Sequence, residues 1–158
     1  MEKYILSVLV QNNAGVLARV SSLFGRRGFN IDSLTVSPTN DEKISRITII
    51  TRGDEKTLDQ IIKQVSKLEE TLWIEHLWED ECYCRELVFV KVLAEDAQTR
   101  DSIREIAEVY NASVVESVKN AIIVELTEIP SRIDAFLSVI SNYTIIEMCR
   151  SGVTAMTR

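Results

Sequence analysis

The sequence is poor in the residues that interrupt a folded chain. It holds 5 glycines and 2 prolines among 158 residues, which leaves no low-complexity or linker-like stretch. No apolar run approaches the roughly 18 residues that a membrane-spanning helix needs. The opening residues, MEKYILSVLVQNN, lack the long apolar core and the cleavage site of a signal peptide. We therefore expect a cytoplasmic globular protein that does not contact the membrane.

Cysteine and histidine are also scarce. The three cysteines, Cys82, Cys84 and Cys149, are expected to be reduced thiols and not a disulfide framework. The one histidine, His76, could form a metal site with Cys82 and Cys84. A packed histidine at the end of a strand is the simpler interpretation, because Cys-x-Cys with one histidine lacks the usual zinc spacing. There is also no glycine-rich phosphate loop. We expect neither catalytic residues nor a metal site in this chain.

Positive charge is in deficit, and unevenly so. The net charge of −6 argues against a nucleic-acid-binding surface. Residues 1–78 carry 10 basic and 10 acidic side chains, whereas residues 79–158 carry 8 and 14. The change at residue 79 predicts two domains, residues 1–78 and residues 79–158.

The first half alternates strand-like and helix-like segments in the order β-α-β-β-α-β. The assignment rests on β-branched runs and on apolar residues at helical spacing. The expected strands are residues 4–10, 29–36, 44–51 and 72–78, and the expected helices are residues 15–27 and a second one running from Asp54 to about Leu68. Gly28 is well placed to end the first helix in a left-handed conformation, and Asp54 to cap the second.

The second half repeats this order. The expected strands are residues 87–93, 112–118, 122–126 and 143–149, with one helix through Ile103, Ile106, Ala107 and Tyr110 and another through Ile133, Phe136, Leu137 and Ile140. Asn111 is a plausible end for the first of these helices, and Pro130 suits the first turn of the other. Residues 119–121 are typical of a hairpin turn.

Two copies of β-α-β-β-α-β predict an α+β fold with two ferredoxin-like domains in tandem. Each domain would carry two helices on one face of an antiparallel sheet. Domains of about 75 residues have small cores, so pairing with another copy or with a partner is expected. In the first domain, Ile5 and Leu9 lie on the sheet face away from the helices. That face is too apolar to be left wholly to water, and we expect a second surface to pack there.

The loop between the first strand and the first helix is the most informative segment. Backbone N–H groups and the positive end of the helix dipole converge there, so a carboxylate binds without a cationic side chain. Gly15 lets a ligand approach the backbone, and Asn12 offers both a donor and an acceptor to an amino acid. Asn30 is a second amide beyond the helix. On these residues alone, ordinary loop chemistry is the simpler interpretation.

A family resemblance favours the functional interpretation. It is carried in the first half by Asn12-x-x-Gly15-x-Leu17-x-Arg19-Val20, Leu23-Phe24 and Arg27-Gly28-Phe29-Asn30-Ile31, and in the second half by Arg85-Glu86-Leu87, Asp134-Ala135-Phe136-Leu137 and Arg150-Ser151-Gly152-Val153. These motifs resemble, in the right order, the small regulatory subunits of acetohydroxyacid (acetolactate) synthase, whose amino-terminal domain is an ACT domain. The resemblance covers nearly the whole chain, and residues 27–31 are its most specific part.

The resemblance implies a site for a feedback amino acid, usually valine, between the ACT domains of two subunits. The polar end of the ligand would be held by Asn12 and by the N–H groups around Ala14, Gly15, Val16 and Leu17. Asn30 and Ile31 of the partner subunit would complete the pocket. The aliphatic side chain would contact neighbours such as Val16 and Leu17.

The resemblance also implies partners. Thiamine diphosphate, magnesium and FAD would be bound by a large catalytic subunit, which condenses pyruvate with pyruvate or 2-oxobutyrate, and no cofactor by this chain. The chain would form a homodimer, raise the activity of the large subunit and make it sensitive to the end product. The alternatives are a free-standing tandem sensor of amino acids that controls another enzyme or a transcription regulator, and an enzyme that acts alone. Because Glu95-Asp96-Ala97 would repel a carboxylate, the second domain is expected to hold the large subunit or to position the sensor.

Overall fold

The computed structural model describes residues 2–158 and divides into two compact units. Unit 1 runs up to Tyr83 and also includes Val153–Arg158, and unit 2 is Cys84–Gly152. The chain therefore leaves the first unit, forms the second and returns to the first. The domains expected from the sequence, 1–78 and 79–158, do not include this return of the chain to the first unit.

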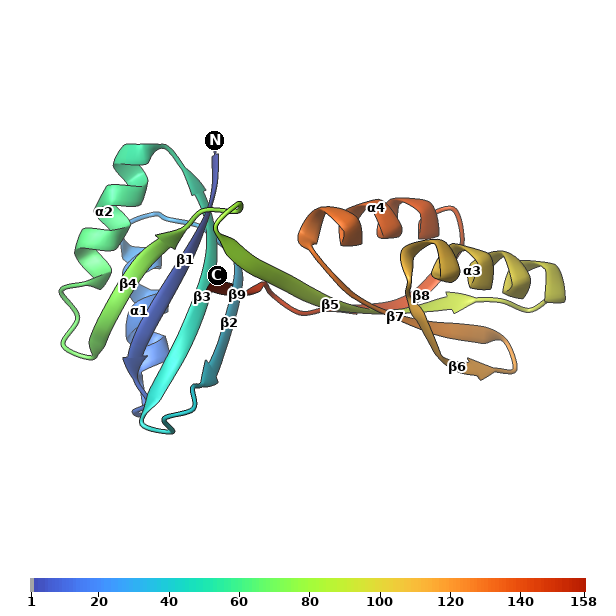
Figure 1. Cartoon of the computed structure of the whole chain (residues 1–158), viewed down its shortest axis with the longest axis horizontal. Helices are drawn as coiled ribbons and strands as arrows, with labels where there is room; N and C mark the ends of the chain where they lie inside the picture. Colours follow the sequence, from blue (N-terminus) through green and yellow to red (C-terminus); the bar gives the residue numbers. More distant parts are fainter. Residues whose placement is uncertain (1) are drawn as a thin grey trace. The chain divides into compact units, whose positions relative to one another are not determined.

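Unit 1 is an antiparallel sheet with two helices on one face (Figure 1). Its elements are β1 (Glu2–Gln11), α1 (Val16–Arg26), β2 (Ile31–Pro38), β3 (Ile44–Gly53), α2 (Glu55–Val65) and β4 (Thr71–Leu77). The strand order β2-β3-β1-β4 leaves β2 and β4 at the edges. The β-α-β-β-α-β order expected from the sequence is confirmed.

Local chemistry sets the helix ends of unit 1 as expected. Gly28 has a φ of +70°, and the N–H of Phe29 donates to the carbonyl of Phe24 at 3.0 Å, which ends α1 in a left-handed turn. The side chain of Asp54 accepts a hydrogen bond from the N–H of Thr57 at 2.8 Å and so caps α2. The beginning of β2 is thereby placed directly after the end of α1.

Unit 2 repeats the arrangement. Its elements are most of β5 (Cys82–Leu93), then α3 (Ala97–Tyr110), β6 (Ser113–Val118), β7 (Ala121–Glu128), α4 (Pro130–Ile140) and β8 (Ile145–Arg150), with the strand order β6-β7-β5-β8. Asn111 ends α3 with a φ of +56°, and Pro130 lies in the first turn of α4. The two ferredoxin-like units are thus both confirmed.

Each unit has its own apolar core between sheet and helices. In unit 1, β1 and β3 contribute Leu6, Val8, Ile47 and Ile49, which pack against α1 and α2; in unit 2, β5 and β7 contribute Val88, Val90, Ile122 and Val124, which pack against α3 and α4. Within residues 2–158, no helix combines the length and the apolar composition that crossing a membrane requires.

Part of the far face of the unit 1 sheet is covered by the C-terminal end of the chain. A last strand, β9 (Thr154–Thr157), pairs with β5 and lies against β1 and β4 (Figure 1). On this face Ile5 and Ile50 are only 3% and 2% exposed, although they point away from the helices. Over Ile5 and Ile50 the second surface expected on this face is therefore present, and β9, which the sequence did not indicate, provides it. Trp73, opposite Leu9 on the same face, is 57% exposed.

Acidification should destabilise the chain through its helix caps. Hydrogen bonds from Thr57 lower the pKa of Asp54, and the backbone N–H of Thr99 lowers that of Asp96, both from 3.8. A carboxyl whose pKa is lower when folded stabilises the fold above its unfolded pKa and loses that effect as pH falls through the folded value. We expect the melting temperature to fall between pH 4 and pH 2.

The matched comparison is the double variant Asp54→Asn with Asp96→Asn. Its side chains do not titrate, so its melting temperature should depend less on pH across that range. An equally steep pH dependence in the variant would show that the caps are not responsible.

Candidate functional site

The β1–α1 loop leaves the start of α1 open. Gly15 is the N-cap residue, with a φ of +84°, and no side chain caps the helix. The N–H of Arg19 donates to the carbonyl of Gly15 at 3.0 Å, so regular helical bonding begins only there. The N–H groups of the first turn, those of Leu17 and Ala18 among them, therefore point out of the helix start, where an anion binds well.

Asn12 is fixed beside this loop by the turn between β2 and β3. Its backbone N–H donates to the carbonyl of Lys43 at 2.7 Å, and its side-chain Nδ2 donates to the carbonyl of Glu42 at 2.8 Å. Because both bonds use N–H groups and the residue is exposed, the side-chain oxygen keeps its capacity to accept a hydrogen bond. The carboxamide is thus oriented before any ligand arrives.

Asn30 lies at the other end of α1 and is also oriented. Its side-chain Nδ2 donates to Asp32 at 2.7 Å, and its carbonyl accepts a hydrogen bond from the hydroxyl of Thr51 at 2.7 Å. Arg52 donates to the same Asp32 carboxylate at 2.6 Å and, as the main cause, lowers the pKa of Asp32. Asp32 is therefore ionised at neutral pH and holds both neighbours.

The predicted site residues form two separate groups within one chain. Asn12, Ala14, Gly15, Val16 and Leu17 surround the start of α1, whereas Asn30 and Ile31 follow its end. A helix of 11 residues separates the two groups by about 16 Å. A single small amino acid cannot contact both groups of one chain. Joining them needs a second chain.

Two neighbouring residues of the loop differ in what they can offer a ligand. The side chain of Val16 is 2% exposed and packs in the unit 1 core, and its N–H donates to the carbonyl of Asn13 at 3.4 Å. The side chain of Leu17 is 39% exposed and gives the loop an accessible apolar surface. In this chain Leu17 is therefore the better placed of the two for an aliphatic contact.

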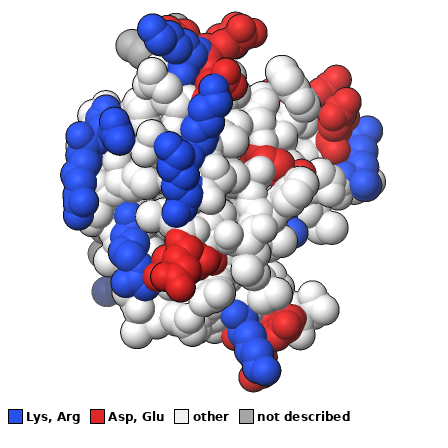
Figure 2. Space-filling model, turned by 90° about the vertical axis from the view of Figure 1, so that its left-hand side faces the viewer, with Lys and Arg blue, Asp and Glu red and all other residues white. Residues whose placement is uncertain are grey.

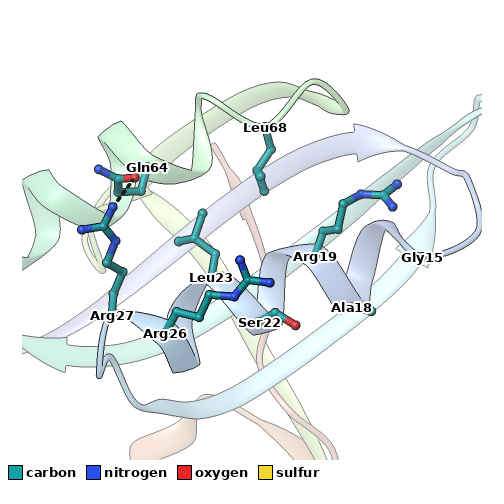
Figure 3. A pocket seen from close by; sticks show the side chains of 9 residues that line it. All are labelled: Gly15, Ala18, Arg19, Ser22, Leu23, Arg26, Arg27, Gln64 and Leu68. Carbon is teal, nitrogen blue, oxygen red and sulfur yellow. Dashed lines mark hydrogen bonds between the residues drawn. The ribbon is translucent and has the colours of Figure 1, made fainter.

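A hollow of about 570 Å³ lies beside the loop, between α1 and α2 (Figure 3). Its lining residues are Gly15, Ala18, Arg19, Ser22, Leu23, Arg26, Arg27, Gln64 and Leu68. Arg19 pairs with Glu70 at 2.5 Å, and Arg27 donates to Gln64 at 3.2 Å. On the face shown in Figure 2, Lys and Arg side chains form several groups, and Asp and Glu side chains lie beside some of them. The loop thus opens onto basic surroundings that suit an anion.

The hollow was not predicted from the sequence, although the spacing of three of its arginines could have indicated it. Arg19, Arg26 and Arg27 recur at a spacing that places them on one side of a helix. The spacing of the arginines does not predict the other wall of the hollow. Gln64 and Leu68 line it only because α2 packs beside α1.

The corresponding helix start in unit 2 is already occupied. Asp96 accepts from the N–H of Thr99 at 2.8 Å and from its hydroxyl at 2.8 Å. A carboxylate of the protein itself thus fills the position that an external carboxylate would take. Of these two corresponding helix starts, that of α1 is open and that of α3 is capped.

His76 is packed among aromatic rings. Its ring centroid lies 5.3 Å from that of Tyr4 and 4.4 Å from that of Trp78, and burial lowers its pKa. Cys82 is buried and Cys84 is half-buried. Across residues 2–158, no group of three His, Cys, Asp or Glu side chains is arranged to hold a metal ion.

Each of the two units matches the model of a known protein family. Residues 6–73 match the model of the AHAS small subunit-like ACT domain, so unit 1 belongs to the ACT class of regulatory domains. Residues 85–158 match the model of the small subunit of acetolactate synthase. The chain therefore belongs to the family of acetolactate synthase small subunits, as the sequence resemblance indicated.

Individual relatives agree over the full length. The chain is 43% identical to the acetolactate synthase small subunit of Mycolicibacterium smegmatis, covering 98% of this chain and 91% of the relative. It is 41% identical to the isozyme 3 small subunit of Escherichia coli, covering 98% and 94%. The crystal structure of the acetolactate synthase small subunit from Thermotoga maritima superposes with a TM-score of 0.91 at 31% identity, covering 100% and 98%. As a small subunit, the chain implies a catalytic large subunit as its partner.

Proposed function

We propose that this chain activates the catalytic large subunit of acetolactate synthase and makes it sensitive to feedback inhibition by valine. The observation that carries the proposal is the uncapped start of α1 beside an oriented Asn12, in a chain of this family. The carboxylate of valine would accept hydrogen bonds from the N–H groups after Gly15. The ammonium group would donate to the side-chain oxygen of Asn12.

The proposed site is shared by two copies of the chain. The loop of one chain supplies Asn12 and Gly15, and Asn30 and Ile31 of the partner subunit close the pocket. Two features support this division: α1 keeps the two groups apart in one chain, and the edge strand β2, which begins at Ile31, is open to pairing. A homodimer formed through the ACT domains would bring the two groups together.

Sharing a site between chains explains how a ligand can inhibit at a distance. A ligand shifts a conformational equilibrium only as far as its affinities for the two states differ. Contacts to both chains make the affinity of valine depend on how the chains are oriented. The bound orientation would then be the one that activates the large subunit less.

The chemistry of the reaction would take place on the large subunit. Thiamine diphosphate, magnesium and FAD would be bound there, and the residues of this chain would act only on valine and on the contacts between subunits. Unit 2, whose helix start is filled by Asp96, would hold the large subunit or position unit 1. A free-standing tandem sensor is disfavoured, because unit 2 matches the model of the small subunit of acetolactate synthase.

The Asn12→Ala substitution should weaken valine binding. It removes the proposed partner of the ammonium group and the bond to Glu42, at a cost of roughly 1–3 kcal/mol, the range for an unpaired buried polar group. The dissociation constant from calorimetric titration should rise by about 5- to 150-fold. The control is Asn13→Ala, since Asn13 is exposed and its side chain donates to that of half-buried Gln11 at 3.0 Å. Equal effects of the two substitutions would contradict the role of Asn12.

The proposed function is tested by titrating the chain with valine, leucine and isoleucine, and by assaying the large subunit with and without the chain. We expect saturable binding of valine, higher activity on addition of the chain, and loss of that gain as valine saturates. A chain that neither copurifies with the large subunit nor changes its activity would contradict the proposal and would support the free-standing sensor.

A further inference from the structure

The last residues of the chain are built into unit 1. We call Val153–Arg158 the C-terminal strap; the whole of unit 2 separates it in sequence from the rest of unit 1. Val153 and Ala155 are 1% and 2% exposed, as deeply buried as core residues of the sheet. The strap is therefore a packed layer of the first unit and not a loose tail.

The strap begins at two side chains of β2. The hydroxyl of Thr35 donates to the carbonyl of Val153 at 2.6 Å, and the N–H of Val153 donates to the hydroxyl of Ser33 at 3.2 Å. Both backbone polar groups of buried Val153 are thus hydrogen-bonded by side chains of β2. The far end of the strap is held elsewhere, since the N–H of Arg158 donates to the carbonyl of Glu81 at 3.2 Å.

The same strand begins at the predicted effector residues. β2 starts at Ile31, immediately after Asn30, and its register with β3 is irregular between Ile31 and Ser33. Asp32 lies in this irregular stretch and accepts from Asn30. A ligand that accepted from the Nδ2 of Asn30 would compete with Asp32 for it, and a β-bulge allows a strand to adjust without losing the rest of its ladder.

On its other side, Val153 leads directly into unit 2. It follows Gly152, and before Gly152 the chain is firmly held: the N–H of Ser151 donates to the carbonyl of Leu87 at 2.8 Å, and the N–H of Leu87 donates to the hydroxyl of Ser151 at 2.9 Å. Arg150 is paired with buried Glu86. The chain is thus hydrogen-bonded within unit 2 up to Ser151, and only Gly152 separates that segment from Val153.

From this arrangement we infer that Ser33 and Thr35 are positioning residues, which transmit the occupancy of the effector site from β2 through Val153 to unit 2. The inference rests on the proposed function, because it presumes an effector at Asn30. It adds the route by which binding in unit 1 reaches the second unit. Neither hydroxyl contacts the effector. Each acts by hydrogen-bonding Val153, so that the position of the strap follows that of β2.

The test separates valine binding from inhibition. Thr35→Val removes the donor and keeps the branched shape, so the complex with the large subunit should no longer be inhibited at saturating valine. The affinity of the small subunit for valine should change by less than about threefold. Thr35→Ser restores the hydroxyl and should restore inhibition. The matched control is Thr154→Val in the strap, an exposed position whose side chain makes no hydrogen bond to any of residues 2–158.

Hydrogen exchange gives a second readout. Valine should change the exchange rate of the peptide covering residues 153–158 in the unaltered chain and in Thr35→Ser, but not in Thr35→Val. Three results would overturn the inference: normal inhibition of Thr35→Val, lost inhibition in Thr35→Ser, or lost valine binding in Thr35→Val. If the unaltered chain itself binds no valine, the proposed function fails as well, so the two failures are distinguishable.

Discussion

A chain carrying Gly15→Asp is expected to lose valine inhibition completely while still activating the large subunit. Gly15 has a φ of +84°, and a Cβ added there would lie 3.3 Å from Nη1 of Arg19. The new carboxylate would repel the carboxylate of valine at the start of α1 and would compete with Glu70 for Arg19. The measurement is the activity of the reconstituted complex against valine concentration.

Two further substitutions separate the causes of this loss. Gly15→Ala keeps the backbone strain without the charge, and should weaken inhibition less than Gly15→Asp. Gly25→Asp places the same charge further along α1, where an added Cβ meets nothing within 4 Å, and should leave inhibition near normal. Normal valine inhibition of the Gly15→Asp complex would count against the proposed location of the carboxylate.

Removing Arg150 is expected to have the largest effect on stability. Its Nε donates to Glu86 at 2.7 Å and its Nη1 to Asp134 at 2.7 Å, while the side chain of Glu86 is only 6% exposed. Arg150→Ala leaves a buried carboxylate without its partner, which costs about 3–5 kcal/mol of unfolding free energy. Urea denaturation of the whole chain, followed by circular dichroism, measures the loss.

The control for Arg150 is Arg132. Its ion pair with Glu128, at 3.5 Å, joins side chains that are 44% and 28% exposed. Such pairs contribute about 0–1 kcal/mol, so Arg132→Ala should change the stability little. Comparable losses in the two variants would show that burial of Glu86 does not decide the outcome.

Much of the fold could be predicted because its signals are local. The spacing of Val16, Val20 and Phe24 predicts the buried side of α1, and Gly28, Asp54 and Asn111 end or start helices through their own backbone or side-chain chemistry. Each of these signals needs only residues within one turn. The β-α-β-β-α-β order of both units follows from them.

What the sequence could not predict depends on distant partners. The strand β9 is too short to show a periodic pattern, and its pairing partner β5 lies far before it in the sequence. The pairing of Arg150 with Glu86 likewise joins residues 64 positions apart. In the candidate site, the loop itself was predictable from Asn12 and Gly15. Its separation from Asn30 became clear only with the length of α1.

The central claim, that two chains share each effector site, is tested by mixing two damaged chains. Gly15→Asp disrupts the β1–α1 loop, and Asn30→Ala removes the carboxamide that the partner supplies. Neither variant alone should therefore bind valine. A mixed dimer would have one doubly damaged site and one intact site. Calorimetry should recover normal affinity at half the normal number of sites in that dimer. If each site is built within one chain, mixing would restore no binding, and the account would be contradicted.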